Sequence, residues 1–197
     1  MLDELLVITR TGEFEDSGNI TLASATWLLD SLHLAFDVEH GDGVESSWVV
    51  HCSRVVEHLL TDSRYQVGLN LWQTEHPLLD QYTQQHFSLY VSAVPTDGDR
   101  VAGELWQAHR KVADDWISFE RYLNTELPLR RLLSSGNALI AAGPDFLINA
   151  YATILEAAGC GASRVALGRP DVAPLQLLHF GASYVVAAGI GAIRSAP

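Results

Sequence analysis

The sequence predicts an α+β protein: an N-terminal antiparallel sheet of about five strands, covered by a long helix and joined to a C-terminal β-α-β lobe. Three observations favour this class. Apolar residues alternate with polar ones through much of the first hundred residues, and after Asp99 they recur every three or four residues. The last seventy residues combine short apolar runs with one helical segment. We therefore expect two lobes, 1–97 and 98–197, packed as one compact unit.

The strand pattern is clearest in SLHLAFDVE, residues 31–39, where four large apolar residues fall on one side. A glycine-containing turn at 40–45 and the valine-rich run 46–60 follow it, so we predict a β-hairpin. The same alternation predicts further strands at 18–24, 65–72 and 86–93.

A helical pattern opens the second half of the chain. Apolar residues at three- and four-residue steps from Val101 to Phe119 predict a helix over 99–123, with an apolar stripe that can cover the sheet. Pro128 prevents this helix from continuing.

The C-terminal segments predict a β-α-β unit. Residues 137–143 form a buried apolar run, 144–159 a helix that starts with a proline, and 163–168 a second strand. The apolar run at 177–189 adds one more strand, or a hairpin bent at Gly181.

Charge and hydropathy exclude two classes of partner. The chain has 24 acidic residues against 12 basic ones, a net charge of −12, and its first fifty residues hold ten acids against the single Arg10. Such a surface repels phosphate, so we expect no nucleic-acid partner. The longest apolar run near the C-terminus, 183–193, is about half the roughly 20 residues that a membrane-spanning helix needs, so we expect no membrane partner.

The N-terminal acids and the cysteines bear on the compartment. Asp3 and Glu4 stand where a secretory signal carries basic residues. Cys52 and Cys160 lie far apart in apolar surroundings, which predicts free buried thiols, with a disulfide as the alternative. We expect a cytoplasmic protein.

The stretch WQTEHPLLDQYTQQHFSLYV, residues 72–91, holds the weak catalytic candidates His76, Asp80 and His86. Pro77 favours a short helix, capped by His76 or Thr74, in which His76 and Asp80 face each other four positions apart. A carboxylate that orients an imidazole is half of a catalytic arrangement, but no nucleophile motif accompanies it. We interpret the stretch mainly as a corner between strands.

A metal site is the second possibility. Alternation places His33, His51 and His86 on faces of their strands that point away from the core. Three imidazoles are zinc or iron ligands if the strands are neighbours, yet their spacing matches no metal signature. The favoured interpretation is a solvated or partner-covered face, without metal or cofactor.

Three aromatic residues are the candidates for binding: Trp72, Tyr90 and Trp106. Trp106 lies off the apolar stripe of the predicted helix, as an interface residue does. We therefore expect a non-catalytic interaction or accessory protein with a protein partner or self-association. The alternative is a small hydrolase or metal-dependent enzyme that uses the histidines and carboxylates of the N-terminal sheet.

Overall fold

The computed structural model describes residues 1–10, 14, 18–40, 43–61, 65–66, 68–171 and 173–195. The fold is mixed α+β with a large antiparallel sheet, as predicted. Contacts divide the chain into two units: unit 1 is Met1–Glu75 with Ala173–Pro197, and unit 2 is His76–Val172. This division differs from the expected lobes 1–97 and 98–197, because unit 2 is inserted into unit 1.

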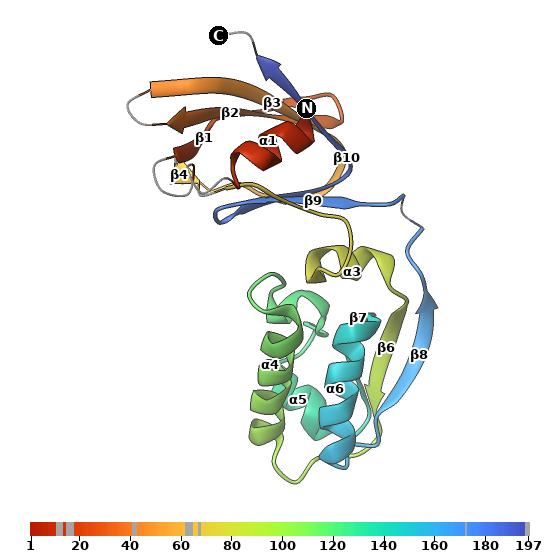
Figure 1. Cartoon of the computed structure of the whole chain (residues 1–197). Coiled ribbons are helices and arrows are strands. Elements are labelled where there is room, and N and C mark those ends of the chain that lie inside the picture. The colour runs from red at the N-terminus through yellow and green to blue at the C-terminus, as the bar shows by residue number, and fades with distance from the viewer. Residues whose placement is uncertain are drawn as a thin grey trace. The chain divides into compact units, whose positions relative to one another are not determined.

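Unit 1 is a seven-stranded antiparallel sheet with the helix α1 (Figure 1). In chain order its elements are α1 (Leu2–Ile8), β1 (Gly18–Leu28), β2 (Ser31–His40), β3 (Gly43–Leu59), β4 (Tyr65–Gln66), β5 (Asn70–Trp72), β9 (Gln176–Phe180) and β10 (Ser183–Ser195). The strands lie side by side in the order β4-β1-β2-β3-β10-β9-β5.

The strands β2 and β3 form the predicted hairpin, although residues 41–42 of its turn lie outside the described part. Successive residues of these two strands point to opposite faces of the sheet. Four residues of β2 and three of β3 point into the core and are at most 1% exposed: Leu32, Leu34, Phe36, Val38, Trp48, Val50 and Cys52. The polar residues between them lie on the opposite face.

The predicted strand 65–72 is wrong as a single element. Gly68 has a φ of +73°, a left-handed conformation that interrupts an extended strand. Tyr65–Gln66 pairs with β1, whereas Asn70–Trp72 pairs with β9. The two short strands therefore lie at opposite ends of the strand order.

The sheet of unit 1 must curl. From Gln66 at one end of the strand order, four residues along the chain reach Asn70 at the other end, and they span at most about 14 Å. A flat sheet of seven strands would separate its outer strands by roughly 29 Å. Leu5 and Leu6 of α1 belong to the same buried cluster as the inward residues of the strands, and in Figure 1 α1 lies within the curve.

Unit 2 contains a three-stranded antiparallel sheet and several helices. Its elements are α3 (Pro77–Thr83), β6 (His86–Val91), α4 (Gly98–Ala113), the 3-10 helix η1 (Phe119–Tyr122), α5 (Leu129–Ser135), β7 (Ala138–Pro144), α6 (Asp145–Ala157) and β8 (Ser163–Gly168). The helix α6 packs on β6 and β7, and α4 packs on α6 (Figure 1). The strand predicted at 86–93 thus belongs to this second sheet and not to the first.

The helix predicted over 99–123 is shorter, and another helix covers its apolar stripe. It ends at Ala113 because Asp114 has a φ of +51°, and it packs on α6 of the same unit. An amphipathic stripe shows that a helix is covered, but it does not say by what. The buried positions on α4 are Val101, Leu105, His109 and Ala113.

The β-α-β unit is present in a split form. β7 and β8 each pair antiparallel with β6, one on each side, so they run in the same direction with β6 between them. The segment 177–189 forms the β9–β10 hairpin, which turns at Gly181 with a φ of +56°. Because β9 also pairs with β5, the chain leaves and re-enters unit 1 on neighbouring strands.

Candidate interaction surface

The turn between β1 and β2 is built from unusual residues. Leu28 pairs with Ser31, so only Leu29 and Asp30 connect the strands. Two-residue hairpin turns require left-handed backbone conformations, which favour asparagine, aspartate or glycine. Leu29 adopts a φ of +57° and is fully exposed. A branched apolar side chain therefore occupies a strained position with its surface in water.

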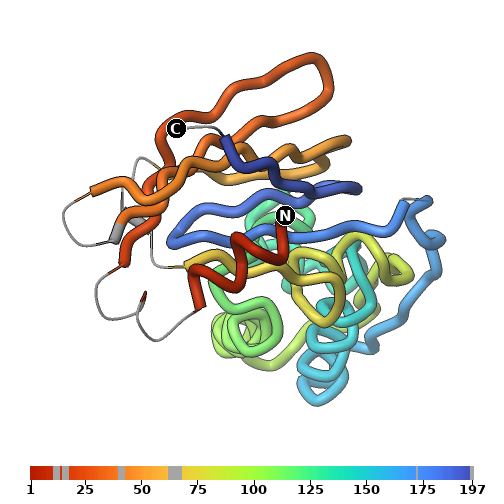
Figure 2. Tube along the Cα trace, turned by 45° about the horizontal axis from the view of Figure 1, so that its top comes forward, coloured from red at the N-terminus to blue at the C-terminus, as the bar shows by residue number. Residues whose placement is uncertain are grey.

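Further exposed apolar side chains flank this turn in the sequence and occur at the end of β3. Trp27 is 47% exposed and Leu28 53%. The ring of Trp27 contacts the ring of His58 edge to face, with centroids 5.4 Å apart, so the end of β3 lies beside the turn. Val56 and Leu59, on the same part of β3, are exposed as well. We call Trp27, Leu28, Leu29, Val56 and Leu59 the apolar tip; the β1–β2 turn can be followed in Figure 2.

The apolar tip lies on the acidic part of the molecule. Unit 1 has thirteen acidic residues against four arginines, a net charge of −9, whereas unit 2 has eleven acids against eight basic residues, a net charge of −3. Asp30 stands in the turn itself, and Glu57 lies between Val56 and His58 on β3. The surface is thus an apolar patch within a negative field.

Sequence reasoning missed the apolar tip, because β1 was predicted to end at residue 24. The signal was present in WLLD, residues 27–30. Three large apolar residues run directly into a position that must be a turn, since the next strand begins at Ser31. Consecutive apolar residues at a turn depart from the polar, glycine-rich composition that turns usually have.

The three predicted binding residues are exposed but lie on different elements. Trp72 is on β5 of unit 1, while Tyr90 is on β6 and Trp106 on α4 of unit 2. The guanidinium of Arg110 lies over the Trp106 ring, 5.7 Å from its centroid. These three side chains do not share an element on which they could form one patch.

The structure engages two of the catalytic candidates in local hydrogen bonds. His76 is buried as the N-cap of α3, where its Nδ1 accepts a hydrogen bond from the Leu78 amide at 3.2 Å. The Nε2 of His86 donates to the carbonyl of Gln81 at 2.8 Å. Asp80 lies in the first turn of α3, as predicted. Capping of α3 explains why a histidine precedes Pro77. The cap uses the lone pair on Nδ1 of His76, which a general base would need to accept a proton.

The three histidines of the metal alternative are not brought together. His33 and His51 are cross-strand partners on β2 and β3, with Nε2 of His33 3.4 Å from Nδ1 of His51. His86 belongs to the other unit, and its Nε2 is bonded to Gln81. Within the described part of the chain, no group of three or more histidine, cysteine or acidic side chains could hold a metal ion.

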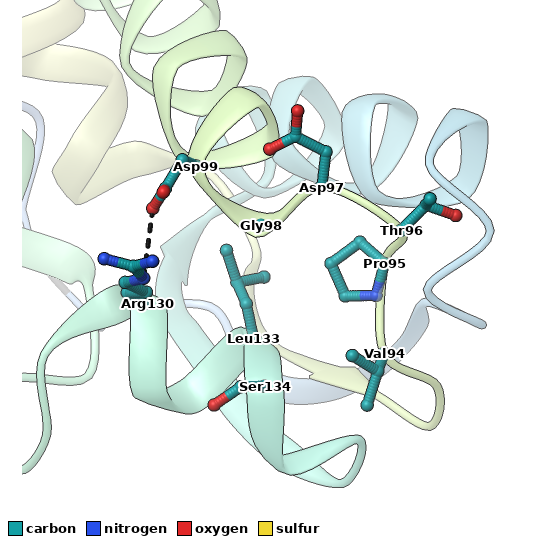
Figure 3. Close-up of a pocket in the computed structure, with 9 residues that line it drawn as sticks. All are labelled: Val94, Pro95, Thr96, Asp97, Gly98, Asp99, Arg130, Leu133 and Ser134. Carbon is teal, nitrogen blue, oxygen red and sulfur yellow. Dashed lines mark ion pairs between the residues drawn. The ribbon is translucent and has the colours of Figure 1, made fainter.

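A pocket of about 480 Å³ lies between the start of α4 and the helix α5 (Figure 3). Its charged side chains are already engaged. Asp97 accepts a hydrogen bond from the Arg100 amide at 3.0 Å, and Asp99 forms an ion pair with Arg130 at 3.2 Å. Both members of that pair are more than half exposed, so the pocket has the character of a wet surface groove.

A buried polar group of unit 2 is His109, which the predicted stripe did not include. Its Nε2 donates to the carbonyl of Ile117 at 2.6 Å, and in the neutral ring its Nδ1 accepts from the hydroxyl of Tyr151 at 2.7 Å. Both side chains are buried. Burial, with a smaller effect of the Glu120 carboxylate, raises the pKa of Tyr151, which keeps its hydroxyl proton available. The arrangement anchors the segment after α4 and is closed to solvent.

Comparison with known proteins yields no match: no protein-family model, no curated protein and no solved structure is significantly similar to the chain. Among the described residues, no helix is long and apolar enough to span a membrane. Function must therefore be argued from the surface itself.

Proposed function

We propose that this protein is a non-catalytic interaction module that binds another protein through the apolar tip of unit 1. The observation that carries the proposal is Leu29, a fully exposed apolar residue in a left-handed turn position. A left-handed backbone costs a non-glycine residue roughly 1–2 kcal/mol. Exposed in water, the side chain offsets none of this cost within the chain. Such strain is typical of sites where a partner supplies the compensating contact.

The composition of the apolar tip supports an interface. Trp27 supplies the large, stiff aromatic anchor that dominates many interfaces, and the aliphatic residues beside it extend the apolar area. Exposed apolar residues scattered singly need no explanation, whereas a gathered set marks an interaction site.

Charge indicates what kind of partner fits. The apolar tip lies in a unit of net charge −9, so a complementary surface is an apolar socket rimmed by lysine or arginine. A second copy of the chain would bring a second charge of −12 to the contact, which disfavours self-association. Nucleic acid is disfavoured for the same reason. Two buried free cysteines support a reducing compartment, the cytoplasm.

The alternative is a small hydrolase or metal-dependent enzyme that uses the histidines. It requires a concave site in which two or more of them meet. Nδ1 of His76 and Nε2 of His86 are used in local hydrogen bonds. In the pocket beside α4, Asp97 accepts from the Arg100 amide and Asp99 is paired with Arg130. The interaction module is therefore the better-supported proposal.

Site-specific photocrosslinking tests the proposal. A photoreactive amino acid replaces Leu29 in the full chain inside cells, and the matched control places it at Val165, which is exposed on β8 of unit 2. We expect one dominant adduct from position 29, absent from position 165 and lost when Trp27→Ala is added. No adduct from position 29, or an adduct indifferent to Trp27, would overturn the proposal.

A further inference from the structure

His33 and His51 form an isolated pair on the outer face of the unit 1 sheet. They are register partners on β2 and β3, between residues that point into the core. Their rings meet edge to face with centroids 4.3 Å apart. Both side chains are partly exposed, so solutes can reach them.

The distance between the two nitrogens is long for a hydrogen bond. Nδ1 of His51 and Nε2 of His33 are 3.4 Å apart, beyond the roughly 2.7–3.2 Å of well-formed bonds. Among the residues that the structure describes, these nitrogens have no hydrogen-bond partner besides each other. A neutral imidazole keeps a lone pair on one nitrogen, and the tautomer is free to change. Each of the two facing nitrogens can therefore present a lone pair.

From this geometry we infer that His33 and His51 form a two-histidine binding site for a divalent transition-metal ion such as Cu²⁺ or Zn²⁺. Imidazole nitrogens bind these ions at about 2.0–2.1 Å, so two nitrogens on one tetrahedral ion lie about 3.4 Å apart. The separation in the structure has this value. Imidazole is a preferred ligand for both ions, and copper binds most strongly in the first-row series.

The surroundings leave room for the remaining ligands of the ion. On β10, Gly191 is the cross-strand neighbour of His51, and a Cβ built at Gly191 would meet no atom within 4 Å. On β1, the neighbour of His33 is Thr26, a hydroxyl residue. Water or an external ligand can thus fill the open positions. The site is an open, exchangeable one, unlike the closed four-ligand sites that hold structural zinc.

Electrostatics supports cation binding at this pair. Unit 1 carries a net charge of −9, which raises the local concentration of cations. The acid nearest along the same face of β2, Asp37, is bonded to Ser47 at 2.6 Å.

Titration of the full chain with Cu²⁺ at pH 7.5 in a non-coordinating buffer tests this inference. We expect one ion per chain, with nitrogen hyperfine structure from two imidazoles in the electron paramagnetic resonance spectrum. His33→Ala and His51→Ala should each weaken binding at least tenfold, which is about the smallest effect of losing even an outer-shell partner. The matched control is His58→Ala, an exposed histidine on the same strand, which should bind as the wild type does.

A second measurement distinguishes the loss of copper binding from the misfolding of a variant. His51→Gln keeps a polar side chain of similar reach, and Cu²⁺ should raise the unfolding midpoint of the wild type but not of this variant. Equal binding by the wild type and both alanine variants, or an equal loss in His58→Ala, would overturn the inference. A spectrum with one coordinated imidazole would also overturn it.

Discussion

The hydroxyl of Tyr151 lies 2.7 Å from Nδ1 of His109, and neither side chain has appreciable access to solvent. Because Nε2 of the same ring donates to Ile117, the neutral imidazole depends on Tyr151 for its second hydrogen bond. This relationship joins α4 to α6 through polar groups inside an apolar contact.

Tyr151→Phe should therefore destabilise the protein with little change in packing. It leaves the buried Nδ1 of His109 without a donor, at a cost of about 1–3 kcal/mol. Denaturant unfolding measures the loss. Tyr90→Phe, a tyrosine on the partly exposed face of β6, is the matched control and should change the free energy of unfolding by less than about 0.5 kcal/mol. Equal values for the two variants would mean that the bond to His109 contributes nothing.

A substitution in the strained β1–β2 turn should stabilise the protein. Leu29→Asn places a residue that tolerates φ near +57° in the turn, so it should raise the free energy of unfolding by roughly 0.5–1 kcal/mol. Leu28→Asn, one position earlier in regular strand conformation, should lower it. A destabilised Leu29→Asn variant would show that Leu29 serves the fold and not an interface.

The turn at Leu29 and the strand beside it show which features can be predicted from the sequence. Strand β2 was predictable because every second residue is buried on one side, which leaves a period of two. The exposed turn beside it was not found, because residues 25–30 belong to no periodic pattern that a core imposes. Periodic patterns record burial in a core, and an exposed apolar turn has no such period.

The sequence also did not indicate which strands that are distant along the chain pair with each other. The segment 65–72 reads as one strand, yet its halves pair with β1 and β9. The insertion of unit 2 depends on contacts between residues 70–72 and 177–179, more than a hundred positions apart. For α4, the sequence shows an apolar stripe but not that α6, about forty residues later, covers it.

The histidine pair predicts a pH dependence of stability. The pKa of His51 is lowered in the folded state, chiefly by burial and also by His33, relative to about 6.5 in the unfolded chain. The unfolded state then binds the proton more readily, so stability is fully present above pH 6.5 and declines as the pH falls through the lower folded value. The unfolding free energy of His51→Gln should fall less than that of the wild type between pH 8 and pH 5. An equal fall in the free energy of unfolding of both proteins would contradict this prediction.

The cysteines should be unreactive in the native protein. Both are buried and free, and burial raises the pKa of the Cys52 thiol to about 12 and also raises that of Cys160. At pH 8 only about one Cys52 in ten thousand would be a thiolate. A chromogenic disulfide reagent should therefore detect no rapidly reacting thiol in native protein and two in guanidinium chloride. Rapid reaction of one equivalent under native conditions would contradict the burial of these side chains.

The most direct test of the central claim, that the apolar tip binds a partner protein, is the affinity of the partner recovered by crosslinking from position 29. Its dissociation constant is measured with purified wild-type protein, with Trp27→Ala, and with Val165→Ala as the exposed control on unit 2. We predict that Trp27→Ala weakens binding about thirtyfold or more, the loss of roughly 2 kcal/mol that marks an interface anchor, while Val165→Ala leaves it unchanged. Unchanged affinity of Trp27→Ala would contradict the account.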